Sequence, residues 1–274
     1  MADLYKKDIE LFREYCKVIT LPSLEGEKQG DPKLIGKKLG MVNGSFWVGL
    51  WANYFSSKIL PGVKRLNVGN DAIQYNFMRA HQLHEECPPQ SNKELIALYA
   101  QQLHHLYAVD AIICTCSTMN RSYPYVEEAM KPYGLPVVQI DIPMMEAAAR
   151  IGGKILVIAT HGPTVESTQL LLRETAQRLK TKLCFDGDII PSAFEMLARG
   201  KIEEHNELIA QSIRKKNAQG RFNAVVLAQL SMTVFKLSYP NCEKEFGVPV
   251  LTSGECGFER IREIFLGKEH KGLA

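Results

Sequence analysis

An internal repeat constrains the fold of this chain more than any other feature of its sequence. Residues 110–119 align with residues 223–232 at an offset of 113. Each segment has a polar first residue, an apolar β-branched run, small and polar residues, and a final Met. Two more pairs of segments follow the same order at nearly the same offset: 136–138 with 249–251, and 38–42 with 154–158. Three matched pairs in one order predict two lobes of similar topology related by an approximate two-fold axis.

Short apolar runs alternate with longer amphipathic stretches along the chain. Several runs are apolar throughout, as strands covered on both faces are. The alternation predicts an α/β fold of two pseudo-symmetric lobes, each a mostly parallel sheet flanked by helices, with a cleft between them. Predicted helices cover residues 91–107, where Ser91 and Glu94 have capping-box spacing, 164–180 and 201–216. Predicted strands cover residues 39–42, 63–67, 111–114, 136–140, 154–158, 182–185, 224–227 and 248–251.

The first 33 residues differ from the rest of the chain. Apolar residues recur at helical spacing, which predicts an amphipathic helix that covers a hydrophobic patch or, alternatively, forms a dimer contact. These residues are Tyr5, Ile9, Phe12, Cys16 and Ile19. We therefore expect three parts: 1–33 as helical extension and linker, 34–143 plus 252–274 as the first lobe, and 144–251 as the second lobe.

Composition excludes several functional classes. The 274 residues carry a net charge of +3, which gives no electrostatic footprint for nucleic acid or a membrane surface. No apolar run is long enough to span a membrane, and the first residues lack a signal-peptide pattern. The seven cysteines are odd in number and scattered, which indicates reduced thiols and a cytoplasmic protein.

The repeat also predicts where a ligand binds. Ligands of open parallel sheets sit beyond the carboxyl ends of the strands. Two such edges that face each other form one cleft, lined by the loops after the paired strands. Those loops are 43–45, 115–120, 160–164 and 229–232.

Two cysteines lie close together at the end of the predicted strand 111–114. Cys114 falls inside the apolar run, so we expect it in the core. Cys116 falls in the polar loop, where free N–H groups and a helix N-terminus would lower the pKa of its thiol. Cys116 is therefore our candidate catalytic residue. A metal site is not predicted, because cysteine and histidine partners at zinc spacing are missing.

The remaining cleft loops carry uncharged hydrogen-bonding groups. Hydroxyl and amide donors of this kind suit a carboxylate or an enolate oxygen, although the same hydroxyls can cap helices. They come from Asn43, Ser45, Thr118, Thr160 and Ser231. Thr164 is expected to cap the helix that follows it. His161 is a candidate acid or base, because it could titrate near neutral pH.

These motifs resemble those of the aspartate/glutamate racemase superfamily, which includes hydantoin racemases, maleate isomerases and arylmalonate decarboxylases. Cys116-Ser117-Thr118 stands where that family has Cys-Asn-Thr, and residues 159–167 are similar to its middle motif. The second cysteine motif aligns with residues 227–230, and Pro249 to Ser253 is similar to its closing motif. The resemblance covers residues 36–266. It implies two lobes and a dimer, and it places substrate contacts at Ser117, Thr118, Thr160 and Thr164.

The chain departs from the family at one decisive position. Family racemases use two thiols on opposite faces of the substrate, and here Gln229 replaces the second. Glutamine neither accepts nor delivers a proton. We therefore expect an isomerase or lyase without cofactor or metal, acting on a small carboxylate or related carbonyl compound through Cys116 as acid/base or nucleophile. Two alternatives stay open: a racemase whose second base is His161 or another group, and a non-catalytic protein that binds a small acid.

Overall fold

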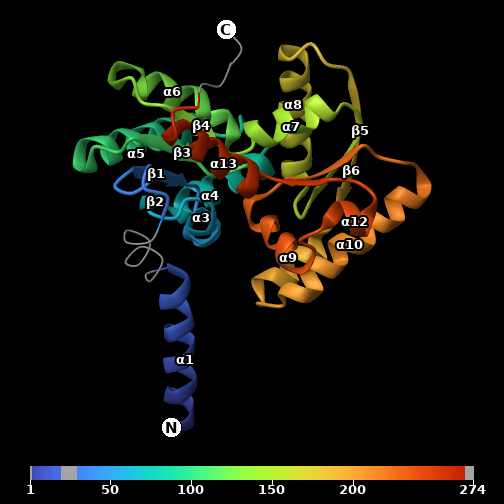
Figure 1. Cartoon of the computed structure of the whole chain (residues 1–274), viewed down its shortest axis with the longest axis horizontal. Helices are drawn as coiled ribbons and strands as arrows, with labels where there is room; N and C mark the ends of the chain where they lie inside the picture. The colour runs from blue at the N-terminus through green and yellow to red at the C-terminus, as the bar shows by residue number, and fades with distance from the viewer. Residues whose placement is uncertain (1, 20–29, 269–274) are drawn as a thin grey trace.

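The computed structural model describes residues 2–19 and 30–268. It contains two four-stranded parallel sheets, as the repeat predicts. The first sheet has the order β2-β1-β3-β4 and the second the order β6-β5-β7-β8. Helices flank both sheets, and the two lobes stand side by side (Figure 1). The strands are β1 (Lys38–Asn43), β2 (Lys64–Gly69), β3 (Ala111–Cys114), β4 (Val137–Gln139), β5 (Gly153–Ala159), β6 (Leu183–Ile189), β7 (Ala224–Leu227) and β8 (Val250–Thr252).

The helices alternate with these strands, and their positions follow the predicted amphipathic stretches. The first lobe contains α3 (Phe46–Ile59), α4 (Asp71–Gln82), α5 (Gln90–Tyr107) and α6 (Tyr123–Met130). The second contains α8 (Gly162–Arg178), α9 (Pro191–Ala198), α10 (Ile202–Gln219), α11 (Phe235–Ser238) and α12 (Cys242–Phe246). Two helices follow the last strand of a sheet: α7 (Ile142–Ile151) and α13 (Ser253–Phe265).

The central strands form the core of each lobe. Every residue of β3 and β7 is buried, because helices cover both faces of each sheet. Cys114 lies in this core and is 8% exposed, which confirms its predicted place. All seven cysteines are free thiols.

Helix α13 follows a strand of the second sheet but packs in the first lobe. Its residues Phe258, Ile261 and Phe265 belong to the same hydrophobic cluster as Leu39 of β1. The backbone of α13 approaches the backbone of Ile140 closely at Gly257. A Cβ at this position would lie 2.8 Å from the backbone oxygen of Ile140.

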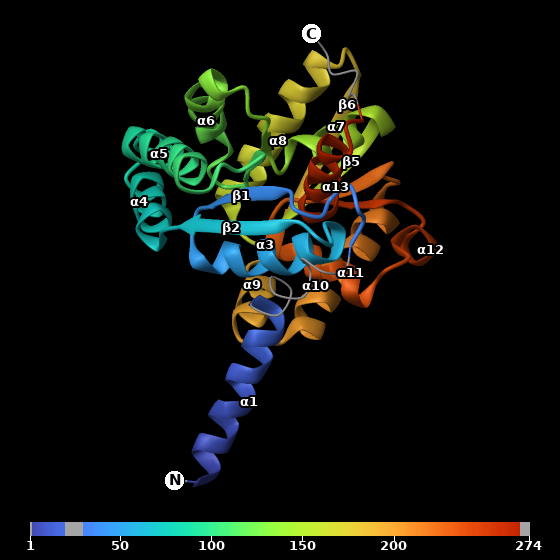
Figure 2. The same cartoon turned by 60° about the vertical axis from the view of Figure 1, so that its left-hand side comes forward.

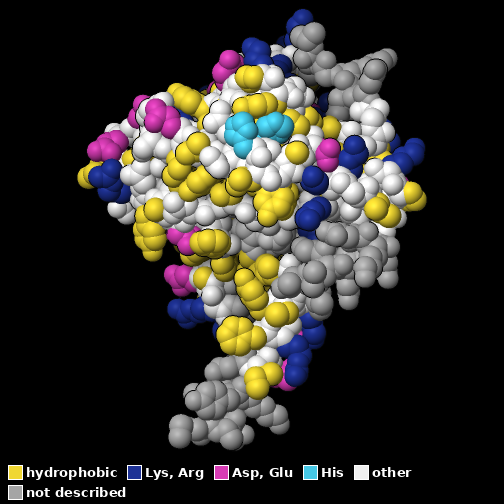
Figure 3. Space-filling model, turned by 90° about the vertical axis from the view of Figure 1, so that its left-hand side faces the viewer, with side chains coloured by type: hydrophobic (Ala, Val, Ile, Leu, Met, Phe, Trp, Pro, Cys, Tyr) yellow, Lys and Arg dark blue, Asp and Glu magenta, His cyan; other side chains and the backbone are white. Residues whose placement is uncertain are grey.

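The N-terminal extension is helical, as its periodicity predicts. Helix α1 (Ala2–Ile19) projects away from both lobes, and hydrophobic side chains lie along it (Figures 2 and 3). Ile9 is 56% exposed and Phe12 is 67% exposed. The expectation that this helix covers a hydrophobic patch is therefore wrong over residues 9–17, which are exposed. Near its end, Tyr15 and Ile19 line a surface hollow beside α3. The predicted linker falls largely outside the described residues.

Two predicted helix caps are wrong. Helix α5 begins at Gln90, and Pro89 occupies its cap position, so Ser91 lies inside the helix. The hydroxyl of Ser91 instead accepts a hydrogen bond from Asn76. Helix α8 begins at Gly162, which places His161 at the cap position and buries Thr164 within the first turn. Within residues 2–19 and 30–268, no helix combines the length and apolar character needed to cross a membrane.

The close approach at Gly257 predicts a stability effect. In Gly257→Ala, the new methyl group would lie 2.5 Å from Cγ1 of Ile140, so α13 must shift. We expect a loss of about 1–3 kcal/mol in the free energy of unfolding, measured by urea denaturation. Gly220→Ala is the control, because its Cβ would meet nothing closer than 3.6 Å. Equal stability of the two variants would contradict the proposed packing constraint.

Candidate active site between the lobes

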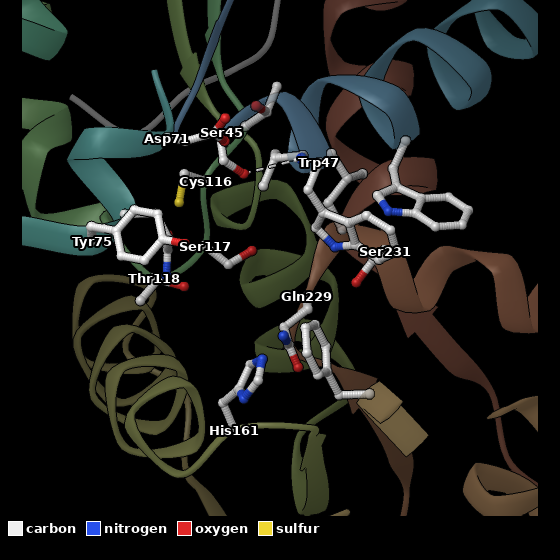
Figure 4. Close-up of a pocket in the computed structure, with 16 residues that line it drawn as sticks. Ser45, Trp47, Asp71, Tyr75, Cys116, Ser117, Thr118, His161, Gln229 and Ser231 are labelled. Carbon is white, nitrogen blue, oxygen red and sulfur yellow. Dashed lines mark hydrogen bonds between the residues drawn. The ribbon is translucent and has the colours of Figure 1, made fainter. Parts of the chain in front are cut away.

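A cavity of about 360 Å³ lies between the lobes at the carboxyl ends of the strands. Residues that follow strands of both sheets line it, as the cleft prediction requires (Figure 4). The lining residues are Ser45, Trp47, Val48, Trp51, Asp71, Gln74, Tyr75, Thr115, Cys116, Ser117, Thr118, His161, Phe194, Gln229, Leu230 and Ser231.

Cys116 lies on the floor of this cavity, in the loop directly after β3. Its side chain is 7% exposed. The backbone of Gly44 in the loop after β1 approaches it closely, because a Cβ there would lie 2.6 Å from Sγ of Cys116. Any side chain at position 44 would therefore displace the thiol.

Burial has the largest effect on the pKa of the Cys116 thiol, and it raises that pKa. Desolvation raises the pKa of Cys116 to about 11, against the smaller opposing effect of backbone hydrogen bonds from Met119 and Thr118. The negative charge of Asp141 raises the pKa further. The predicted lowering of the pKa is therefore wrong: the expected N–H groups are present, but the loss of solvent outweighs them. At neutral pH Cys116 is a protonated thiol.

A buried carboxylate lies behind the floor of the cavity. Asp141 is 2% exposed and accepts hydrogen bonds from the hydroxyl of Ser117 at 2.9 Å and the amide of Gln139 at 2.8 Å. Desolvation raises the pKa of Asp141 to about 6 despite these bonds, so it is mostly ionised at neutral pH. Since Ser117 donates its only hydroxyl proton to Asp141, its oxygen can only accept hydrogen bonds in the cavity.

The amide of Gln229 has a fixed orientation. Its carbonyl oxygen accepts from the backbone N–H of Thr160 at 2.7 Å and from the hydroxyl of Thr160 at 2.8 Å. A backbone N–H can only donate, so the oxygen must face Thr160 and the NH₂ group is left as a donor. Gln229 therefore presents hydrogen-bond donors where the family's second thiol would stand.

His161 faces the cavity from the second lobe. Its ring packs against Phe194 of α9, with 4.5 Å between the ring centroids. Desolvation by this burial lowers the pKa of His161, so its imidazole is neutral at pH 7 and can accept a proton.

The structure brings most of the predicted site residues together. Seven line the cavity: Ser45, Cys116, Ser117, Thr118, His161, Gln229 and Ser231. Three do not line it: Asn43, Thr160 and Thr164. Asn43 is buried behind the floor, where its oxygen accepts from the hydroxyl of Thr115 at 2.6 Å. It thereby fixes the loop that carries Cys116.

Sequence reasoning missed the walls of the cavity. Trp47 and Trp51 come from α3, Asp71 and Tyr75 from α4, and Phe194 from α9. The i, i+4 spacing within each of the first two pairs places both residues on one helix face, which was the available signal. What the sequence did not show is that these faces turn toward the cleft.

The charges around the site are unbalanced. Asp71 is the one acidic residue in the described lining, which contains no Lys or Arg. Arg121, in the loop after the cysteine motif, instead binds Glu174 of α8 at 2.8 Å and so ties the two lobes together. Among the described residues, no three His, Cys, Asp or Glu side chains gather as a metal site would require.

Solved structures of racemases and a related decarboxylase share this fold. An aspartate racemase homologue from Pyrococcus horikoshii OT3 superposes with a TM-score of 0.61 at 16% identity, over 84% of this chain and 99% of its own. Allantoin racemase from Klebsiella pneumoniae gives 0.58 at 16% identity, over 85% and 89%. A variant of arylmalonate decarboxylase gives 0.57 at 13% identity, over 86% and 97%.

The fold and the inter-lobe site are those of a two-lobed α/β enzyme. The Asp/Glu/hydantoin racemase family model matches residues 78–261, and the chain belongs to this family. It is thus an enzyme of a racemase family, as the sequence resemblance predicted. No curated protein matches the chain.

The raised pKa of Cys116 predicts how this thiol reacts with iodoacetamide. At pH 7 only about one part in 10⁴ is thiolate for a pKa of about 11. The alkylation rate should therefore rise about tenfold per pH unit from pH 7 to beyond pH 9, followed by peptide mass spectrometry. The exposed Cys184 is the internal reference and should react faster than Cys116 at pH 7. A Cys116 rate that already levels off near pH 7 would contradict the buried thiol.

Proposed function

We propose that this enzyme transfers a proton to the carbon next to the carboxylate of a small acid, with the Cys116 thiol as the general acid. The observation that carries the proposal is a buried, protonated thiol in a cavity whose lining has the amide of Gln229 at the position related to Cys116 by the repeat. An acid of high pKa holds its proton until a strongly basic carbon forms beside it.

Uncharged donors would hold the substrate carboxylate and the enolate formed from it. Gln229 offers its NH₂ group, since its oxygen is occupied by Thr160. The hydroxyl of Ser45 accepts from the backbone N–H of Val48 at 3.3 Å, which leaves its own proton to donate. Thr118 and Ser231 add further hydroxyls to the lining. Fixed donors in a buried site stabilise negative charge as it develops on oxygen.

The proton and electron balance allows two closely related reactions. In a decarboxylation, the bond to one carboxyl group breaks, carbon dioxide leaves, and its bonding electrons form an enolate. In an isomerisation, a base first removes a proton from carbon to give an enolate and later releases that proton to solvent. In both, the enolate carbon takes the proton from Sγ of Cys116, and the thiolate regains one from solvent.

A second candidate is racemisation with His161 as the other base. The supporting observation is that His161 lines the same cavity and burial lowers its pKa, so it is neutral. A neutral imidazole could remove the α-proton while Cys116 supplies a proton from the other face. The protonation states of the two side chains suit this division of roles.

Exchange at carbon tests the role of Cys116. Small carboxylic acids that raise the melting temperature are incubated with the enzyme in D₂O, and deuterium at the α-carbon is followed by NMR. We expect Cys116→Ala to lower the exchange or turnover rate by at least about 100-fold, because general acid catalysis contributes that much. Cys184→Ala is the matched control, since this exposed thiol lies outside the cavity. Retained activity in Cys116→Ala would overturn the proposal.

His161→Gln separates the two candidate reactions. If Cys116 acts alone as the acid in a decarboxylation, the variant should keep product formation within about tenfold, since only a cavity contact is lost. If His161 is the second base, deuterium exchange at the α-carbon should fall by about 100-fold or more. Circular dichroism checks that α8, which begins beside this residue, remains folded.

A further inference from the structure

The mouth of the cavity combines a carboxylate with aromatic rings. Asp71 and Tyr75 lie one turn apart on α4, and both are exposed where the cavity opens. Trp47 of α3 packs edge-on against Phe194 of α9 at 6.3 Å, and against Trp51 at 5.3 Å. In Figure 4, Tyr75 lies on one side of the cavity and Trp47 on the other. The mouth therefore differs sharply from the floor, which carries the thiol, hydroxyl and amide groups.

The charges of the site disfavour a negatively charged group at the end of the substrate that lies beside Asp71. The described lining holds Asp71 and no Lys or Arg, and the buried Asp141 lies directly behind Ser117. A second anionic group at the mouth would meet the Asp71 carboxylate without a compensating cation. A positive group there would be attracted by Asp71, and Tyr75, Trp47 and Phe194 of the same lining supply the aromatic rings that cation–π attraction requires.

We propose that the substrate carries a positively charged nitrogen group at the end remote from its reacting carboxylate. Asp71 and the rings of Tyr75, Trp47 and Phe194 hold this group at the cavity mouth. The inference rests on the proposed function, which places the carboxylate at the floor beside Cys116. The inference adds the chemistry of the other end of the substrate. The substrate would then be a zwitterion of low net charge, with its carboxylate at the floor of the cavity and its positive group at the mouth.

A matched pair of probes tests this charge preference. The first is γ-butyrobetaine, a trimethylammonium carboxylate, and the second is its tert-butyl isostere, in which carbon replaces the charged nitrogen. The two have the same shape and differ in one positive charge. Calorimetric titration should show the betaine binding at least about tenfold more tightly, from the combined ion-pair and cation–π attraction. A tert-butyl probe that binds as tightly or more tightly, or a betaine that does not bind, overturns the inference.

Two aspartate variants locate the preference in the protein. Asp71→Asn should reduce the preference for the betaine by about three- to tenfold, while its amide oxygen can still accept from the backbone N–H of Phe46. Asp110→Asn is the control, because this exposed carboxylate likewise accepts a backbone N–H, from Lys38, but outside the cavity lining. An equal effect of both variants would mean that only the overall charge matters, which also overturns the inference.

Failure of this inference is distinguishable from failure of the proposed function. If the tert-butyl probe binds and the betaine does not, the carboxylate site stands and the cation site is wrong. Butyltrimethylammonium, which lacks the carboxylate, tests the other end. If it binds as tightly as the betaine, the cation site stands and the carboxylate contacts of the proposed function are wrong.

Discussion

Desolvation of the Cys116 thiol sets the protonation state of the one cysteine in the described lining of the cavity. The thiol is confined by the backbone at Gly44 and by the first-lobe core, and burial raises its pKa to about 11. Backbone N–H groups hydrogen-bond to the sulfur, but they only partly offset the rise in pKa that desolvation causes. A thiol in this state is a weak nucleophile at neutral pH and keeps its proton, which is the property that our proposal uses. The same residue in an open loop would be better suited to covalent attack.

The second lobe complements this thiol without duplicating it. At the position related to Cys116 by the internal repeat, Gln229 is held by two hydrogen bonds from Thr160. The strands of the two lobes are therefore pseudo-symmetric, while the side chains that follow the equivalent strands β3 and β7 differ. One strand end carries a buried thiol, the proton donor in our proposal, and the other carries an amide whose NH₂ group is free to donate hydrogen bonds. His161, whose ring packs against Phe194 and whose pKa is lowered by burial, lines the same cavity.

Local pattern was enough to predict the strands, the two lobes and the loops that meet at the cleft. Cys116 and Gln229 were found because the internal repeat relates the residues that follow β3 and β7, the equivalent strands of the two sheets. The acidity of Cys116 was predicted wrongly, because burial depends on the packing of both lobes around the loop. The aromatic wall was missed for a related reason: helix periodicity shows that Trp47 and Trp51 share a face, but not what that face meets. Asn43 and Thr160 were assigned to the substrate, whereas the structure shows them supporting Thr115 and Gln229. Dimerisation stays a prediction.

Helix α13 has a consequence for motion. The chain passes from the first sheet to the second through α7, and it returns through α13, which packs in the first lobe. Glu146 of α7 binds Arg178 of α8 and Arg260 of α13, so both crossings are fastened to the same point. The two crossings and the ion pairs of Glu146 therefore join the lobes at one place. Trp47 and Phe194 meet in the lining of the cavity between the lobes, so a movement that parted these two rings would widen that cavity.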